Sequence, residues 1–194
     1  RHTRSAHVSW LGDVYKRQDA YSQDHFKKTL TEKLPDYQSS FQEQARNYNH
    51  DWELLVAMGY QESHLNANAV SPTGVRGIMM LTNNTAKAMG VSDRVDPYQS
   101  IGGGARYLEQ VKEDFADVPK TDRIWFALAG YNMGPNAVKS IQRKLRAQGI
   151  DDKSWANIYA YLSENRASNS RYGQAMHYVS NIRSYLETIK TQTV

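Results

Sequence analysis

Residues 51–62, with the sequence DWELLVAMGYQE, decide the fold of this chain. An α-helix advances about 100° per residue, so the apolar side chains of this stretch form a stripe that must face a core. The stripe consists of Trp52, Leu55, Val56 and Gly59. Glu62, the last residue of the stretch, falls on the same side, so its carboxyl group is directed along the core and not into bulk water.

Glu62 also lies at the predicted C-terminus of this helix, where the helix dipole is negative. Desolvation and the dipole both disfavour a charged carboxylate, so we expect a raised pKa for Glu62. A carboxylic acid that stays protonated near neutral pH can act as the general acid at a glycosidic oxygen. The alternative is an ordinary glutamate at a helix end with its carboxylate in water.

Three blocks in order give Glu62 a context. Ser63 follows it directly, the polar turn SPTG at 71–74 leads to GIMML at 77–81, and ALAGYNMGP occupies 127–135. Together these blocks resemble the signatures of lytic transglycosylases, which are relatives of goose-type lysozyme. The likeness is closest to the membrane-bound lytic murein transglycosylase F group and covers roughly residues 37–186.

The resemblance implies a mostly α, lysozyme-like (goose-type) domain with a saccharide-binding cleft and at most a very small β element. It implies a peptidoglycan lytic transglycosylase, which cleaves the β-1,4 bond between N-acetylmuramic acid (MurNAc) and N-acetylglucosamine (GlcNAc) without water and leaves 1,6-anhydroMurNAc ends. Glu62 would be the only essential carboxylate, first as acid and then as base for the C6 hydroxyl. The alternatives are a hydrolytic muramidase and a non-catalytic peptidoglycan-binding protein.

The resemblance also assigns roles to three residues that lie far from Glu62 in the chain. Tyr131 would be a hydrogen-bond partner of Glu62, and Asn132 would anchor the substrate or a loop. Tyr178 begins the segment YVSNI, which is similar to a late Tyr-Val motif of the family. Without the resemblance, a core aromatic, a polar helix end and ordinary packing would explain these three residues.

The remaining predicted substrate-binding residues belong to the first two blocks. Ser63 and Ser71 match family serines near the cleft, although either could be a turn residue. Gly77, Met79 and Met80 would line the cleft beside the sugar, although methionines also fill gaps in a core. Many relatives have Gln where this chain has Met80, so the local sugar contacts differ from theirs.

Neither a second catalytic carboxylate nor a metal site is expected. Asp93 and Asp96 are the next acids after the loop, and Asp96 precedes Pro97 in the pattern of a helix cap. Glu53 is opposite to Glu62 in helical phase. The six histidines are scattered and form no His-Glu-x-x-His pattern, so we predict no metal and no cofactor.

With 194 residues, the chain has room for one domain. We expect leading helices over 19–50, a catalytic domain over 51–190 and a tail over 191–194. Helices are predicted at 24–34, 37–48, 51–62, 82–89, 96–111, 122–132, 137–147, 155–162 and 175–189. Residues 77–81 read as a short strand-like run, and close packing against a neighbouring helix should explain the three glycines at 102–104.

The formal charge of +4 depends on the first 18 residues. Residues 8–18 resemble a translated sequencing adapter, so 1–18 is either such a scar or a disordered tail. Without it, 20 basic and 19 acidic residues remain, and the case for a nucleic-acid partner disappears. No run is long enough to span a membrane. We expect a monomer that acts on peptidoglycan strands in the periplasm, at the inner face of the outer membrane in the full-length protein.

Overall fold

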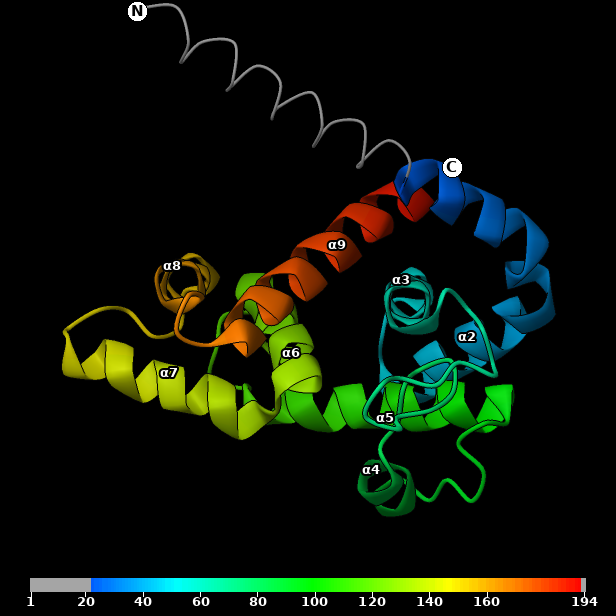
Figure 1. The fold of residues 1–194 in the computed structure, drawn as a ribbon, viewed down its shortest axis with the longest axis horizontal. Coiled ribbons are helices and arrows are strands. Elements are labelled where there is room, and N and C mark those ends of the chain that lie inside the picture. Colours follow the sequence, from blue (N-terminus) through cyan, green and yellow to red (C-terminus); the bar gives the residue numbers. More distant parts are fainter. Residues whose placement is uncertain (1–21, 193–194) are drawn as a thin grey trace, which may run out of the picture.

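The computed structural model describes residues 22–192, and the predictions for residues 1–18 lie outside this range. The described part is a bundle of helices (Figure 1). A helix over residues 22–32 is followed by α2 (Leu34–Tyr48), α3 (Trp52–Ser63), α4 (Asn83–Ala88), α5 (Pro97–Asp114), α6 (Lys120–Met133), α7 (Pro135–Ala147), α8 (Trp155–Asn165) and α9 (Ser170–Gln192). The predicted helical fold is therefore confirmed. None of the described helices is long and apolar enough to cross a membrane.

The helix that carries Glu62, α3, lies in the middle of the molecule. It packs against α2 and α9, and Figure 1 shows it between α9 and α5. Every residue from Leu54 to Tyr60 is buried, whereas Trp52 is only partly buried. The predicted single apolar stripe was therefore too narrow, because a helix with neighbours on several sides needs apolar residues all around it.

The predicted helix starts lie within three residues of the observed ones except for α9, which begins at Ser170 and not at Ala175. The helices are not all capped in the same way. The Thr82 side chain accepts a hydrogen bond from the backbone N–H of Thr85, and the Asp96 side chain accepts one from Gln99. Asp51 occupies the N-cap position of α3, but its side chain makes no cap hydrogen bond. Its carboxylate instead lies 3.0 Å from Lys190 Nζ, which links the start of α3 to the end of α9.

The prediction of a strand-like run at residues 77–81 was wrong. Residues 77–80 form a tight turn that is closed by an isolated β-bridge between Arg76 and Leu81, and Arg76 forms a second bridge with Val70. Gly77 (φ 89°) and Met80 (φ 49°) both have positive φ angles, which extended strands do not allow. Within residues 22–192 these bridges are the β content, in agreement with the prediction of a very small β element.

The glycines at the start of α5 permit close contact with this turn. A Cβ atom on Gly104 would lie 2.7 Å from Met79 Cβ, and one on Gly103 would lie 2.5 Å from a methyl group of Val91. Only Gly102 faces a helix, at Gln44 of α2. Gly103 and Gly104 thus contact loop residues, whereas we expected a neighbouring helix. The 77–80 turn packs directly against α5.

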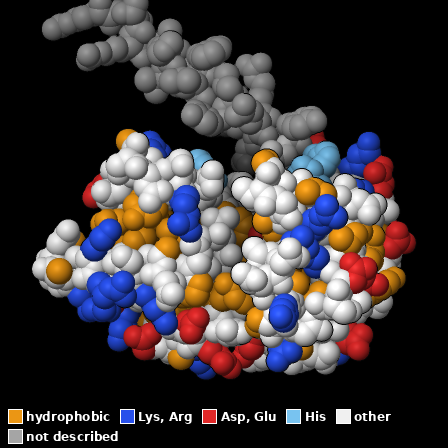
Figure 2. All heavy atoms as spheres, turned by 60° about the horizontal axis from the view of Figure 1, so that its bottom comes forward, with side chains coloured by type: hydrophobic (Ala, Val, Ile, Leu, Met, Phe, Trp, Pro, Cys, Tyr) orange, Lys and Arg blue, Asp and Glu red, His pale blue; other side chains and the backbone are white. Residues whose placement is uncertain are grey.

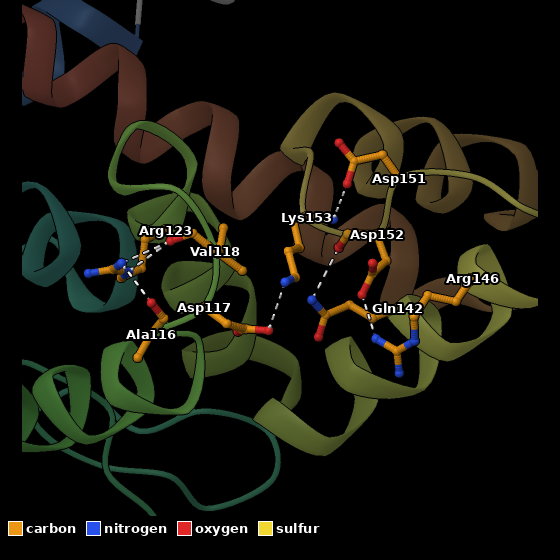
Figure 3. A network of polar contacts seen from close by, with 9 residues as sticks. All are labelled: Ala116, Asp117, Val118, Arg123, Gln142, Arg146, Asp151, Asp152 and Lys153. Carbon is orange, nitrogen blue, oxygen red and sulfur yellow. Dashed lines mark hydrogen bonds and ion pairs between the residues drawn. The ribbon is translucent and has the colours of Figure 1, made fainter.

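The opposite end of the molecule is held by polar contacts around the α7–α8 loop (Figure 3). Arg146 of α7 binds the Asp152 carboxylate at 2.5 Å, and Gln142 donates to the backbone carbonyl of Asp152 at 3.1 Å. Lys153 reaches Asp117, beyond the end of α5, at 3.6 Å. These contacts fix the loop that leads into α8.

Candidate active site

Glu62 lies in the last turn of α3 and is half-buried. The Tyr178 hydroxyl, from α9, donates a hydrogen bond of 2.7 Å to Glu62 Oε1. Burial raises the pKa of Glu62 to about 7, against the opposing effect of the Tyr178 hydrogen bond, which stabilises the charged form. The raised pKa that the sequence predicted is confirmed, so a proton is available on this carboxyl group near neutral pH.

The hydrogen bond that we expected from Tyr131 to Glu62 is made by Tyr178 instead. Tyr131, near the end of α6, donates to the backbone carbonyl oxygen of Met79 at 2.8 Å. Its hydroxyl still belongs to the same cluster, because burial and then the charge of Glu62 raise the pKa of Tyr131 well above its usual value. The reason for the difference is tertiary: α9 packs along α3, whereas the end of α6 faces the 77–80 turn.

The 77–80 turn is fastened to the helices around it by hydroxyl groups. Ser63 Oγ lies 2.8 Å from the carbonyl oxygen of Ile78 and 3.0 Å from that of Gly59, so these two acceptors share its single O–H donor. Ser100 Oγ, on α5, accepts a hydrogen bond of 3.0 Å from the backbone N–H of Met79. Ser63 therefore positions the turn beside Glu62 instead of offering its hydroxyl freely to a ligand.

Gly77 is required by the geometry of this turn. Its φ angle is 89°, and a Cβ atom there would collide with the carbonyl oxygen of Arg94. Met79 is fully buried, so its backbone carbonyl and not its side chain belongs to the site. Met80 is half-buried and is the residue of the turn whose side chain reaches the surface.

Two of the predicted residues lie at the edge of this arrangement. Ser71 Oγ accepts from the backbone N–H of Val75 at 3.0 Å and is hydrogen-bonded to Thr73, so it closes a turn of the 66–76 loop. Asn132 follows Tyr131 at the end of α6, and its side chain is exposed. A contact between Asn132 and a ligand thus stays a prediction, whereas Ser71 has the alternative role of a turn residue.

Sequence reasoning missed two residues that support the site. The Tyr107 ring of α5 lies 5.2 Å from the Tyr131 ring, centroid to centroid, and Arg171 donates to the carbonyl oxygen of Met133 at the end of α6 at 2.5 Å. Tyr107 could have been found, because it lies one helical turn after Gly104 and so shares the face that packs on the 77–80 turn. Nothing local to Arg171 marks it.

Figure 2 shows one face of the molecule hollowed between its two halves, with hydrophobic side chains along the hollow. A long saccharide cleft with Glu62 at its centre stays a prediction. The two other acids that the sequence analysis considered already have partners. The Asp93 carboxylate accepts a hydrogen bond of 3.0 Å from the backbone N–H of Val95, and the Asp96 side chain caps α5. Within residues 22–192, no group of three or more His, Cys, Asp or Glu side chains could hold a metal ion.

Known proteins resemble this chain in sequence and in fold. Residues 39–154 match the family model of the transglycosylase SLT domain. The chain is 40% identical over 200 residues to membrane-bound lytic murein transglycosylase F of Shewanella pealeana, and 42% identical over 193 residues to that of Stutzerimonas stutzeri. These alignments cover 96% and 94% of this chain but 41% and 38% of the relatives, so the chain spans about two fifths of their length.

The fold is shared with a solved structure. The X-ray structure of an inactive mutant of the lytic transglycosylase Slt from Pseudomonas aeruginosa matches with a TM-score of 0.58 and 21% sequence identity. The match covers 77% of this chain and 23% of that one, which confirms the predicted lysozyme-like helical fold. The matched family range contains Glu62, Met79 and Tyr131, whereas Tyr178 lies beyond its end.

Proposed function

This chain belongs to the family of transglycosylase SLT domains, and we propose that it is the catalytic part of a peptidoglycan lytic transglycosylase. The substrate would be the glycan strand, cleaved at the β-1,4 bond between MurNAc and GlcNAc. The observation that carries the proposal is the state of Glu62, a half-buried carboxyl group with a pKa of about 7 whose Oε1 is held by Tyr178. Such a group can give a proton and take one back at the same pH.

The reaction needs two proton transfers at Glu62. Because the Tyr178 hydroxyl occupies Oε1, Oε2 is the oxygen that protonates the bridging O4 as the bond between C1 of MurNAc and O4 of GlcNAc breaks. The N-acetyl group can assist this departure. The C6 hydroxyl of the same MurNAc then attacks C1, and the Glu62 carboxylate accepts the hydroxyl proton. A C1–O6 bond replaces the C1–O4 bond, no water is consumed, and Glu62 is protonated again.

The residues around Glu62 supply positioning. Tyr178 stabilises the carboxylate that forms after the first transfer, since it donates to the charged form. Tyr131 holds the 77–80 turn through the carbonyl group of Met79, and Gly77 gives that turn its shape. Ser63 fastens the turn to α3.

Three side chains at the margins of this arrangement are proposed to contact the glycan. Asn132 is exposed and Met80 is half-buried, so both can meet a sugar without a change in the core. Ser71 closes a turn of the 66–76 loop, so its role would be to position that loop against the glycan. No cofactor is needed for this chemistry.

The products distinguish this reaction from hydrolysis. A muramidase that inverts the anomeric carbon needs a second carboxylate to activate water, and the next acids along the chain, Asp93 and Asp96, are engaged with backbone N–H groups. Digestion of purified sacculi followed by mass spectrometry should therefore give anhydromuropeptides, which are lighter by one water than hydrolysed ones. Muropeptides with reducing ends as the main product would identify a muramidase instead.

The variant Glu62→Gln tests the alternative of a non-catalytic peptidoglycan-binding protein. General acid–base catalysis contributes roughly 10²–10⁴-fold to rate, so Glu62→Gln should lower the release of soluble fragments by at least about 100-fold. Its circular dichroism spectrum should stay that of a folded helical protein. Equal release by the two proteins would mean that Glu62 takes no part in a reaction.

The names of the relatives suggest the cellular place. We propose that the full-length protein is periplasmic and membrane-associated, at the inner face of the outer membrane, and that it works there as a monomer. Fractionation of cells that express the full-length protein, with markers for both membranes, tests the location. Light scattering of the purified protein tests the oligomeric state.

A further inference from the structure

A second hollow lies between the start of α6, α8 and α9. Three aromatic side chains line it: Trp125 of α6 and Trp155 and Tyr159 of α8. Its volume is about 600 Å³, within the range of about 300–1,000 Å³ that is usual for small-molecule sites. The two tryptophans are partly buried against the core, and Tyr159 is 39% exposed.

The aromatic rings form a supported platform. The Trp155 and Tyr159 rings lie one helical turn apart on α8, with centroids 6.4 Å from each other in an edge-on arrangement. Behind them, Trp155 packs against the buried Phe126 with centroids 6.0 Å apart. An aromatic face carries negative charge density, so it attracts the polarised C–H bonds on the flat side of a pyranose ring.

Polar groups stand at the edge of the same hollow, where sugar hydroxyl and amide groups need partners. Asp122 and Ser180 line it, and Asp122 Oδ2 accepts from the backbone N–H of Trp155 at 2.8 Å. The Arg183 guanidinium group lies 5.0 Å from the centroid of the Trp125 ring, within the range of a cation–π contact. The hollow therefore combines apolar surface with a few oriented donors and acceptors, as saccharide recognition requires.

The charges at the hollow favour a neutral ligand. Asp122 and Arg183 have opposite charges, and Arg183 has a further acidic neighbour, Glu187, at 3.8 Å. An acidic peptide would find no excess of positive charge here, whereas an N-acetylglucosamine unit is uncharged and needs no such excess. The aromatic platform and the charge balance thus point to the glycan rather than to a peptide.

The loop that leads into α8, which carries two of the three aromatic rings, is held by hydrogen bonds without any ligand. The loop before α8 is held by the contacts in Figure 3, and Asn157 of α8 donates to the backbone carbonyl of Asp151 at 2.9 Å. Lys153 N–H donates to the Asp151 carboxylate at 2.9 Å, so the loop is tied to itself as well. A site that is already ordered loses little conformational entropy on binding.

This hollow is separate from Glu62. At about 100° per residue, Ser180 and Arg183 point about 200° and 140° around α9 from Tyr178, the residue that contacts Glu62. We propose that the hollow is a second saccharide-binding site, which takes an N-acetylhexosamine segment of the glycan strand on the side of α9 turned away from Glu62. The choice of a glycan as the ligand rests on the proposed function. The hollow and its aromatic lining are features of the structure and do not depend on that function.

The four tryptophans of the chain allow a direct test by NMR. Chitotetraose, a neutral tetramer of GlcNAc, is titrated into ¹⁵N-labelled Glu62→Gln protein, whose indole N–H signals are assigned by single Trp→Phe variants. The signals of Trp125 and Trp155 should shift along one common binding curve. The signal of Trp52 should stay in place, because ten residues of helix put it about 15 Å along α3 from Glu62 and outside the second hollow.

Variants at exposed tyrosines complete the test. Tyr159→Ala should weaken the binding curve by about fivefold or more, as for other aromatic anchors. Tyr98→Ala is the matched control, since Tyr98 is 57% exposed on α5 and lies outside the hollow. Unmoved Trp125 and Trp155 signals, equal affinity in Tyr159→Ala, or a response to a stem peptide but not to chitotetraose would each overturn the proposal.

The two proposals fail separately. Anhydromuropeptide products together with silent Trp125 and Trp155 signals would leave the proposed reaction in place and remove the second site. Hydrolytic products together with chitotetraose binding at these tryptophans would leave the second site in place and remove the proposed transglycosylase reaction.

Discussion

The raised pKa of Glu62 has a consequence for stability that can be measured without any substrate. The ordinary pKa of the carboxyl group is 4.5, and its value in the folded protein is about 7. Between these values the folded state binds the proton more tightly than the unfolded chain does. The contribution of Glu62 to the free energy of unfolding is therefore largest below pH 4.5, falls as the pH rises towards 7, and stays level above that.

The variant Glu62→Gln should remove this loss. A pKa difference of about 2.5 corresponds to about 3 kcal/mol, at 1.36 kcal/mol for each pKa unit. The amide can still accept the hydrogen bond from Tyr178, so the shape of the site is kept. We expect the variant and the parent protein to be equally stable at pH 4, and the variant to be more stable by about 3 kcal/mol at pH 8.

Urea unfolding, followed by circular dichroism from pH 4 to pH 8, measures the difference between the two proteins at each pH. Thermal unfolding gives an independent value, since about 3 kcal/mol corresponds to a rise in Tm of roughly 6–12 °C for a chain of this size. A difference that does not change with pH would refute the reasoning, because Glu62 would then have the same pKa in both states. A variant that gains stability and loses activity would show a carboxyl group kept for catalysis at a cost to the fold.

Three further changes test other parts of the structure. Tyr178→Phe removes the hydrogen bond that favours the charged carboxylate, so the pKa of Glu62 should rise above about 7, and the decline of kcat/KM at high pH should move upward with it. Gly77→Ala should lower the free energy of unfolding in urea by at least about 2 kcal/mol more than Gly74→Ala does. Both glycines have positive φ, but only at Gly77 would a Cβ atom collide with the carbonyl group of Arg94. Equal losses of stability in the two variants would contradict the turn geometry. If residues 1–18 are an adapter-derived scar, they were never selected to pack, and their deletion should leave Tm and activity almost unchanged; a loss of several degrees would show that this segment belongs to the protein.

Local patterns in the sequence determined most of the helices. The caps at Thr82 and Asp96 were predicted correctly, because a helix start depends on neighbours within three residues. Glu62 was also singled out from the sequence, because the helical spacing directs it along the core near a helix end and the three blocks around it resemble those of lytic transglycosylases. The strand-like interpretation of residues 77–81 failed because Gly77 and Met80 have positive φ angles, and an apolar run in the sequence does not record them.

Which tyrosine holds Glu62 was decided by tertiary structure alone. Tyr131 and Tyr178 both carry a phenol near the site, and each was a candidate in the sequence. The packing of α9 along α3 brings Tyr178 to 2.7 Å from Glu62, while the end of α6 directs Tyr131 to the Met79 carbonyl group. A hydrogen bond across 116 positions of the chain depends on how helices cross, and no local pattern records a crossing. The sequence by itself thus determined the acid and the helix that carries it, whereas the partner of that acid follows only from the packing of distant helices.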